Sequence, residues 1–321
     1  MKRLGLLTSG GDAPGMNPAI RAVVRSADAL GVEVVGFADG FAGLMEGRGT
    51  VLSVRDVGDI LQRGGTVLRT ARCPEMRSPS GVARAVASLE SHEVEGLVVV
   101  GGDGSLKGAR ALAREGVRVV GVPASIDNDI PGTVMAIGVD TALGTIMEAI
   151  DKLRDTASSH QRAFLVETMG RHSGYLASMA GVICGAEVVV VPEVETTLQE
   201  IGDAISEAHR RGKQHCIVLV AEGAATNVRE LADWLEERAL GFESRITTLG
   251  HVQRGGGPSP FDRMLASRLG IHATQALTDG ATEVMVGYDG RGTTLVPLAD
   301  VGDSRKSPSR EYLEMVRLLS R

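Results

Sequence analysis

Residues 117–133, VRVVGVPASIDNDIPGT, contain the pattern that decides the fold class. The apolar run Val117–Val122 predicts a buried strand, and Pro123 ends it. A hydroxyl and two carboxylates follow at Ser125, Asp127 and Asp129. A turn needs one aspartate at most, so a pair directly after a strand indicates a loop that binds a ligand.

Apolar runs of this kind recur along the chain and alternate with helical patterns. Residues 138–153 predict a helix, because their apolar side chains follow the i, i+3, i+4, i+7 rule. Such alternation is typical of βαβ units, so the sequence predicts an α/β fold with mostly parallel sheets. We expect two lobes, formed by residues 1–138 with about 252–300 and by 139–251 with about 301–321. The predicted strands are Arg3–Thr8, Val32–Phe37, Gly96–Val100, Val117–Val122, Phe164–Thr168, Val188–Val191, Ile217–Ala221, Ile246–Leu249 and Glu283–Gly287.

Composition narrows the class of protein. Only 3% of the 321 residues are aromatic and 42 are glycine, which suits many tight strand-to-helix turns better than a β-sandwich. The net charge of −6 argues against nucleic acid or an anionic membrane as a main partner, although arginines in one cleft can still bind a phosphorylated ligand. The three cysteines lack disulfide or metal spacing, and the N-terminus reads as a first strand rather than a signal peptide. No stretch approaches the ~20 apolar residues of a membrane span, so we expect a cytoplasmic protein.

A glycine-rich loop, residues 8–17 (TSGGDAPGMN), joins the first predicted strand to a helix predicted at Pro18–Ala29. It lacks the Gly-Lys-Ser/Thr of a Walker loop and the spacing of a dinucleotide fingerprint. Exposed N–H groups at a helix N-terminus favour phosphate. A plain strand-to-helix turn accounts for this loop equally well.

A second loop, residues 101–108 (GGDGSLKG), follows the strand predicted at Gly96–Val100. Gly102 and Gly104 let another backbone or a ligand approach closely, and Gly108 falls one turn into the next helix, where a side chain would obstruct a neighbour. Asp103 is either a Mg²⁺ ligand or a helix cap. Ligands gather beyond the carboxyl ends of parallel strands, so the three loops are expected to meet at one cleft around Asp12, Asp103, Asp127 and Asp129.

Seven motifs in order identify a family resemblance over nearly the whole chain: LTSGGDAPGMN at 7–17, GGDGS at 101–105, SIDND at 125–129, RDTASSHQR at 154–162, VETMGRHSGYLA at 166–177, AEG at 221–223 and LGHVQRGG at 249–256. Together they resemble the 6-phosphofructokinase family in its bacterial ATP-dependent form. The resemblance implies two doubly wound lobes with the active site in the cleft between them, assembled as a homotetramer. It implies phosphorylation of fructose 6-phosphate at its 1-hydroxyl by Mg-ATP, the committed step of glycolysis.

The resemblance also implies a role for each matching residue. Asp127 is similar to the base that deprotonates the 1-hydroxyl, and Asp129 to an aspartate acting through the metal or its waters. Ser125 stands where the family usually has threonine. The catalytic set is Asp127, Ser125, Asp129, Arg72 and Arg171. ATP contacts match Gly11, Arg72, Cys73, Arg77, Gly102, Asp103, Gly104, Ser105 and Gly108, with Asp103 holding Mg²⁺. Sugar-phosphate contacts match Ser125, Asp127, Arg162, Met169, Gly170, Arg171, Glu222, Arg245, His251 and Arg254.

Two of these arginines, Arg162 and Arg245, come from a neighbouring subunit in the family. An effector site for ADP or phosphoenolpyruvate is implied as well, although Gln214 replaces a common second lysine there. The matching effector residues are Arg21, Arg25, Arg154, Gly185, Glu187, Arg211 and Lys213.

Alternative interpretations remain for single residues and for the whole chain. A lone arginine is more often a solvated surface charge than a ligand, a lone His251 is more often structural, and Cys73 suits a packing position. Pyrophosphate-dependent relatives typically carry Asp at position 104 and Lys at 124, so Gly104 favours ATP, while Ala124 departs from the family's usual glycine. The competing functions are a pyrophosphate-dependent or other hexose-phosphate kinase and a catalytically weak regulatory paralogue. The segment after Asp289 carries no family motif.

Overall fold

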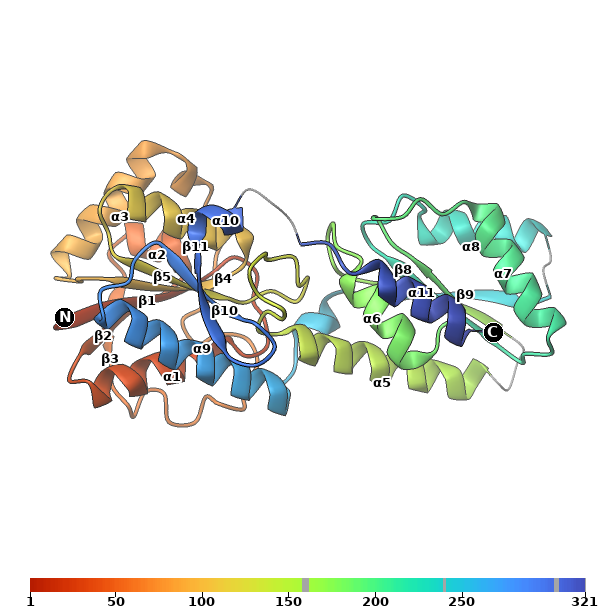
Figure 1. The fold of residues 1–321 in the computed structure, drawn as a ribbon, viewed down its shortest axis with the longest axis horizontal. Helices are drawn as coiled ribbons and strands as arrows, with labels where there is room; N and C mark the ends of the chain where they lie inside the picture. Colours follow the sequence, from red (N-terminus) through yellow and green to blue (C-terminus); the bar gives the residue numbers. More distant parts are fainter. Residues whose placement is uncertain (158–161, 239–240, 303–305, 321) are drawn as a thin grey trace. The chain divides into compact units, whose positions relative to one another are not determined.

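The computed structural model describes residues 1–157, 162–238, 241–302 and 306–320. The chain forms two compact units that are described separately (Figure 1). The first comprises 1–126, 130–141 and 254–305, and the second comprises 127–129, 142–253 and 306–321. Residues 127–129 carry two of the predicted site carboxylates. They are grouped with the second unit, although the residues before and after them in the sequence belong to the first.

The first unit is built on a seven-stranded sheet in the order β11-β10-β5-β4-β1-β2-β3. Its five inner strands run parallel, and β3 and β11 pair antiparallel at the two edges. The strands are β1 (Arg3–Ser9), β2 (Glu33–Phe37), β3 (Gly49–Leu52), β4 (Leu97–Gly101), β5 (Val119–Pro123), β10 (Val284–Tyr288) and β11 (Thr293–Pro297).

Helices cover both faces of this sheet, which makes the unit doubly wound. Helices α1 (Met16–Ala29) and α9 (Pro260–Thr278) pack side by side below it in Figure 1, and α3 (Pro79–Ser91), α4 (Asp103–Arg114) and α10 (Leu298–Gly302) lie above. Strands β4 and β5 are buried along their whole length, as expected for central parallel strands. Gly270 permits the close approach of α9 to α1, since a Cβ there would lie 2.9 Å from the carbonyl oxygen of Ala19.

The strand order reverses direction between β1 and β4. From β1 the chain moves outward to β2 and β3 and then returns to the other side of β1 as β4. In open parallel sheets, ligands bind outside the carboxyl ends of the strands at such a switch point. The loops that follow β1 and β4 are the two glycine-rich loops singled out in the sequence.

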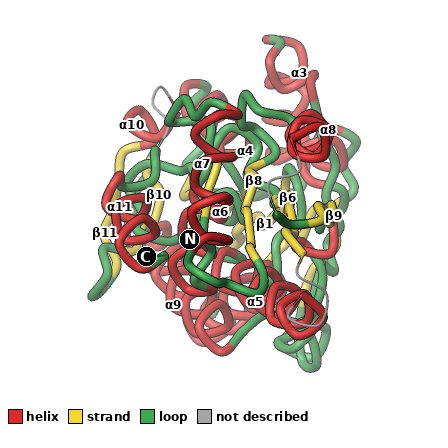
Figure 2. Tube along the Cα trace, turned by 90° about the vertical axis from the view of Figure 1, so that its right-hand side faces the viewer, coloured by secondary structure: helices red, strands yellow, loops and turns green. Residues whose placement is uncertain are grey.

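The second unit contains a four-stranded parallel sheet in the order β7-β8-β6-β9. One face packs on α7 and α8 through alternate residues such as Cys216, Val218 and Val220. The other packs on α6 and α11, which lie side by side (Figure 1 and Figure 2). The elements are α5 (Val139–Ala157), β6 (Arg162–Thr168), α6 (Tyr175–Cys184), β7 (Val188–Val190), α7 (Leu198–Arg210), β8 (Cys216–Ala221), α8 (Val228–Arg238), β9 (Glu243–Thr248) and α11 (Arg310–Leu319).

The expected α/β fold with mostly parallel sheets is confirmed, with local corrections. The two antiparallel edge strands, β3 and β11, were not predicted. The last strand of the second unit begins at Glu243 rather than Ile246, and the first helix begins at Met16 rather than Pro18. Residues 158–161 of the RDTASSHQR motif lie outside the described residues.

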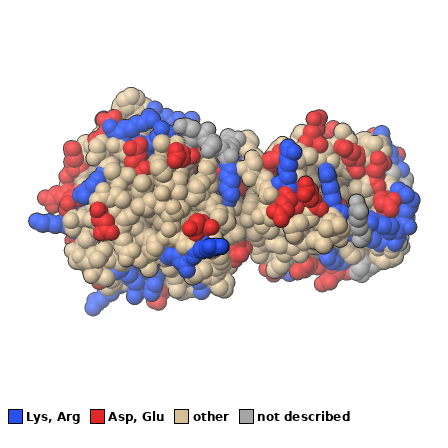
Figure 3. Space-filling model, in the orientation of Figure 1, with Lys and Arg blue, Asp and Glu red and all other residues tan. Residues whose placement is uncertain are grey.

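On the face drawn in Figure 3, basic and acidic side chains are interspersed over each unit. Cys73, Cys184 and Cys216 are all free thiols. Within the described part of the chain, no helix is long and apolar enough to cross a membrane.

Candidate active site

The loops after β1 and β4 touch at the switch point of the first unit. A Cβ on Gly10 would lie 3.1 Å from Ser105 Oγ, and one on Gly101 would lie 2.5 Å from the carbonyl oxygen of Ser9. The second contact is too short for any side chain, so glycine at 101 is a condition of the loops' close approach. This packing brings Gly11, Gly102, Asp103, Gly104 and Ser105 to one edge of the sheet.

The segment that carries Arg72, Cys73 and Arg77 is tied to the same edge by hydroxyl groups. Thr70 Oγ1 donates to the carbonyl oxygen of Gly10 over 2.7 Å. Thr8 Oγ1 donates to the carbonyl oxygen of Arg69 over 2.8 Å. Arg72 and Arg77 are exposed, whereas burial raises the pKa of the half-buried Cys73 thiol, which argues against a nucleophilic role.

The first turn of α4 offers a carboxylate beside open space. Asp103 is the first residue of α4 and pairs with Lys107 over 2.9 Å. A Cβ on Gly104 would meet nothing within 4 Å, whereas one on Gly108 would lie 2.7 Å from the ring of Phe41. The two glycines therefore differ in their surroundings: Gly108 lets α4 pack closely on Phe41, whereas Gly104 borders open space.

This arrangement fits a Mg²⁺ ion that is carried by phosphates. Among the described residues, no three His, Cys, Asp or Glu side chains form a metal cluster. Mg²⁺ usually takes one or two protein carboxylates together with substrate phosphates and waters. Asp103, next to the open space at Gly104, meets that requirement as a single carboxylate.

Arg254 lies against the first glycine-rich loop. Its Nη1 donates to the carbonyl oxygen of Asp12 over 3.1 Å, and a Cβ on Gly11 would lie 2.9 Å from the same nitrogen. The family resemblance implies an ATP contact for Gly11 and a sugar-phosphate contact for Arg254. In the structure these two residues are neighbours within the first unit.

In the second unit, most predicted sugar-phosphate residues lie at the carboxyl ends of adjacent strands. Met169, Gly170 and Arg171 follow β6, while Glu222 follows β8. Glu222 Oε1 accepts hydrogen bonds from the backbone N–H groups of Gly170 (3.1 Å) and Arg171 (2.6 Å). Gly170 and Arg171 both have positive φ, 146° and 55°. Because that backbone is strained for arginine, Glu222 holds the loop in the conformation that presents the exposed Arg171 side chain.

The loop after β9 is fixed to the same edge by a residue that the sequence analysis missed. Gln253 is fully buried and accepts a hydrogen bond from the N–H of Met169 over 3.2 Å, while donating to the carbonyl oxygen of Gly250. His251, two residues earlier, is exposed. The HVQR motif draws attention to Gln253, but the residue that it contacts, Met169, lies 84 positions away in the sequence.

The Asp127–Asp129 segment is grouped with this unit. Asp127 is only 2% exposed and Asn128 has a φ of 48°. Lys306 donates its backbone N–H to the carbonyl oxygen of Asp129 over 3.2 Å, and its Nζ lies 5.7 Å from the ring of Tyr175. Burial lowers the pKa of Lys306 to about 8, opposed by the nearby Asp129 carboxylate. Ser125 lies in the first unit, where its N–H donates to the carbonyl oxygen of Ile137.

Arg162 and Arg245 are not brought to this edge. Arg162 is the first residue of β6, whereas Met169 follows its last, so about 20 Å of extended strand separates them. Arg162 and Arg245 both pair with Glu243, which lowers the pKa of that carboxyl mainly through Arg162. The two arginines therefore form a basic pair towards the amino ends of β6 and β9.

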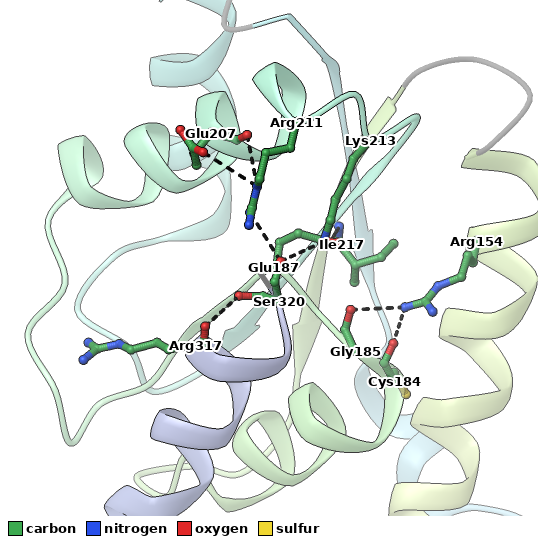
Figure 4. A network of polar contacts seen from close by, with 10 residues as sticks. All are labelled: Arg154, Cys184, Gly185, Glu187, Glu207, Arg211, Lys213, Ile217, Arg317 and Ser320. Carbon is green, nitrogen blue, oxygen red and sulfur yellow. Dashed lines mark hydrogen bonds and ion pairs between the residues drawn. The ribbon is translucent and has the colours of Figure 1, made fainter.

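Three cationic residues of the predicted effector site, Arg154, Arg211 and Lys213, lie near the amino ends of β7 and β8 (Figure 4). Lys213 Nζ pairs with Glu187 over 2.8 Å, and Glu187 also accepts from the N–H of Ile217. Arg154 donates to the carbonyl oxygens of Cys184 and Gly185. Arg211 lies beside Lys213, whereas the predicted effector residues Arg21 and Arg25 lie on α1 of the first unit.

Comparison with known proteins gives a consistent family assignment. Residues 3–277 match the family described as phosphofructokinase. The chain is 50% identical to the ATP-dependent 6-phosphofructokinase of Thermotoga neapolitana over 321 residues, covering 100% of both chains. It is 47% identical over 320 residues, again covering 100% of both chains, to the enzyme of the same name from Bacillus subtilis.

Solved structures agree at the level of fold. A phosphofructokinase from Pichia pastoris, solved in the T-state, matches 99% of the chain with a TM-score of 0.90 and 34% identity. The chain spans only 37% of that fungal protein's length. A pyrophosphate-dependent phosphofructokinase from Marinobacter aquaeolei matches 98% of this chain and 91% of its own, with a TM-score of 0.82 at 19% identity, and shows the fold alone.

Proposed function

Because the chain belongs to the phosphofructokinase family, we propose that it transfers the γ-phosphoryl group of Mg-ATP to the 1-hydroxyl of fructose 6-phosphate. The products are fructose 1,6-bisphosphate and ADP, which makes this a cytoplasmic enzyme of glycolysis. The observation that carries the proposal is Asp127, a carboxylate 2% exposed on a segment grouped with the loops that bear Arg171 and Glu222. Burying a carboxylate costs free energy unless hydrogen bonds or a nearby cation compensate for it, and carboxylates held in this way are concentrated at functional sites.

We assign to the residues the roles that the family resemblance implies. In the second unit, Met169, Gly170, Arg171, Glu222 and His251 bind the sugar phosphate, and Asp127 takes the proton of the attacking hydroxyl. In the first unit, Gly11, Arg72, Cys73, Arg77 and residues 102–105 hold ATP, with Arg72 opposing charge on the transferring group. Asp103 would hold Mg²⁺, which would neutralise phosphate charge. Ser125, Asp129 and Arg254 complete the set.

ATP is favoured over pyrophosphate as donor. The open space at Gly104 leaves room for a nucleotide phosphate, and the curated relatives at 47–50% identity are named ATP-dependent. The test is a coupled assay of the purified protein with fructose 6-phosphate and either ATP or pyrophosphate, with other hexose phosphates as acceptor controls. We expect turnover with ATP; faster turnover with pyrophosphate would overturn the role of Gly104, and none with either donor would favour a regulatory paralogue.

We further propose a homotetramer in which Arg162 and Arg245 complete a neighbouring subunit's sugar-phosphate site. About 20 Å of strand separates Arg162 from Met169 of its own chain, so one chain is not expected to place both on one small ligand. The pair with Glu243 would then be exchanged for the 6-phosphate, which arginine binds through paired hydrogen bonds.

Dissociating the oligomer should therefore abolish sugar-phosphate binding rather than merely slow turnover. Sedimentation velocity and fructose 6-phosphate titration on the same diluted samples would measure both quantities. Unchanged affinity in a demonstrated monomer would contradict the shared site.

The cationic cluster of Figure 4 is proposed as an effector site for ADP or phosphoenolpyruvate. Arg154, Arg211 and Lys213 supply positive charge, Glu187 completes a Mg²⁺-ADP site, and Gly185 lies at the end of α6. Arg21 and Arg25 belong to the same proposed set. Gln214 is exposed and donates to the carbonyl oxygen of Gly212, so we expect a weak response to phosphoenolpyruvate. Initial-rate kinetics with added phosphoenolpyruvate would check this, and strong inhibition at low concentration would contradict it.

A further inference from the structure

Two cations of the proposed effector site converge on a single oxygen atom of the protein itself. Lys213 Nζ donates to the backbone carbonyl oxygen of Ser320 over 2.9 Å, and Arg211 Nη2 donates to the same oxygen over 3.3 Å. Ser320 directly follows α11, 107 residues beyond Lys213. Figure 4 shows the end of α11 reaching these two side chains.

The chemistry of that oxygen makes it a weak substitute for phosphate. The last carbonyls of a helix lack intrahelical partners and carry the negative end of the helix dipole. They attract cations, but a phosphate oxygen bears full charge and makes stronger hydrogen bonds with Lys and Arg. A phosphate oxygen placed between Lys213 and Arg211 would have to take the position that the Ser320 carbonyl holds.

The position of α11 does not depend on these two cations alone. Val316 is 4% exposed and packs near Gly181 of α6, where a Cβ would lie 3.0 Å from its side chain. Tyr312 makes an edge contact with Tyr175, with ring centroids 6.1 Å apart. These apolar contacts hold α11 against α6, and its last turn therefore lies beside Lys213 and Arg211.

We infer that the last turn of α11 is an internal competitor for the phosphate-bearing ligand of Arg211 and Lys213, and must leave them when that ligand binds. The inference rests on the effector site proposed above and adds its regulation. The turn keeps the site closed to weakly bound anions, and a phosphorylated effector opens it.

The test compares effector affinity in two matched variants. A chain ending at Arg317 loses the Ser320 carbonyl but keeps Tyr312 and Val316. The double variant Leu318→Ala with Leu319→Ala changes two exposed side chains, 67% and 59% exposed, and keeps the carbonyl. Titration calorimetry with phosphoenolpyruvate and with Mg-ADP should show roughly ten- to a hundredfold tighter binding to the truncated chain, the worth of one charge-assisted hydrogen bond. The double alanine variant should bind as the wild type does.

Lys213→Met, made in the full and truncated chains, separates the two proposals. If Lys213→Met abolishes effector binding while truncation leaves affinity unchanged, the competitor is refuted and the effector site stands. If neither the full-length wild type nor the truncated chain binds phosphoenolpyruvate or Mg-ADP, the effector site and the internal competitor are both refuted. Binding by the truncated chain alone would mean that the turn closes the site fully.

Hydrogen exchange of the unaltered protein provides a second measurement in case the truncated chain does not fold. Saturating phosphoenolpyruvate should accelerate exchange of the last amides of α11, including that of Ser320, which donates to Val316. Unchanged exchange at saturation would overturn the competitor.

Discussion

Replacing Asp127 with serine is expected to lower kcat by about two to four powers of ten, the usual size of a general-base contribution. The KM for fructose 6-phosphate should change far less, because proton removal matters mainly in the transition state. A coupled assay at saturating ATP would give both constants. The expectation requires that Asp127 accepts the proton of the attacking hydroxyl and that neither Asp129 nor Ser125 can take over this role.

Asp127→Asn is the matched control, because it keeps the shape of the side chain and removes the base. Both variants should fold, with at most a modest fall in melting temperature, since serine and asparagine each keep a hydrogen-bonding group at this 2% exposed position. Retention of more than about a tenth of kcat in either variant would remove Asp127 from the role of base. An equal loss of kcat together with a large fall in melting temperature would identify a structural residue instead.

Whether a strand could be predicted from the sequence depended on how deeply that strand is buried. Strands such as β4 and β5 are covered on both faces, so they read as continuous apolar runs. The edge strands β3 and β11 are half-buried or exposed along their length and are only four and five residues long. Their pairing depends on a neighbour in space, which a local pattern does not contain.

The same reason separates the site residues that the sequence predicted from those that it missed. Glycines and aspartates that directly follow apolar runs can be recognised as candidate site residues from the sequence, because few other residue types adopt such turns or ligate a metal. Gln253, Glu243 and Lys306 act through partners far along the chain: Met169 is 84 residues from Gln253, and Arg162 is 81 residues from Glu243. Outside the site, Asp262 shows the same kind of long-range contact, since it accepts hydrogen bonds from Gly138 and Thr141 across more than 120 residues.

Gly104→Asp is expected to reduce kcat/KM for ATP by roughly a hundredfold. Position 104 lies in the first turn of α4, beside the proposed magnesium ligand Asp103. An added carboxylate about 5 Å from a nucleotide phosphate would cost about 3 kcal/mol at an effective dielectric of 20, which is roughly a factor of a hundred in binding. Folding should be unaffected, because a Cβ at position 104 meets nothing within 4 Å and acidic residues favour a helix N-terminus.

Gly104→Asn tests whether charge or bulk is responsible, since asparagine has the same shape without the charge. We expect Asn to retain most of the ATP affinity that Asp loses, with the difference shrinking at high salt as screening weakens the repulsion. Gly108→Ala is the contrasting variant: its methyl would lie 2.7 Å from the Phe41 ring, so it should lower the melting temperature rather than select against ATP. Equal losses in the Asp and Asn variants would replace electrostatic repulsion with steric exclusion, and full activity in both would show that the nucleotide phosphates do not approach position 104.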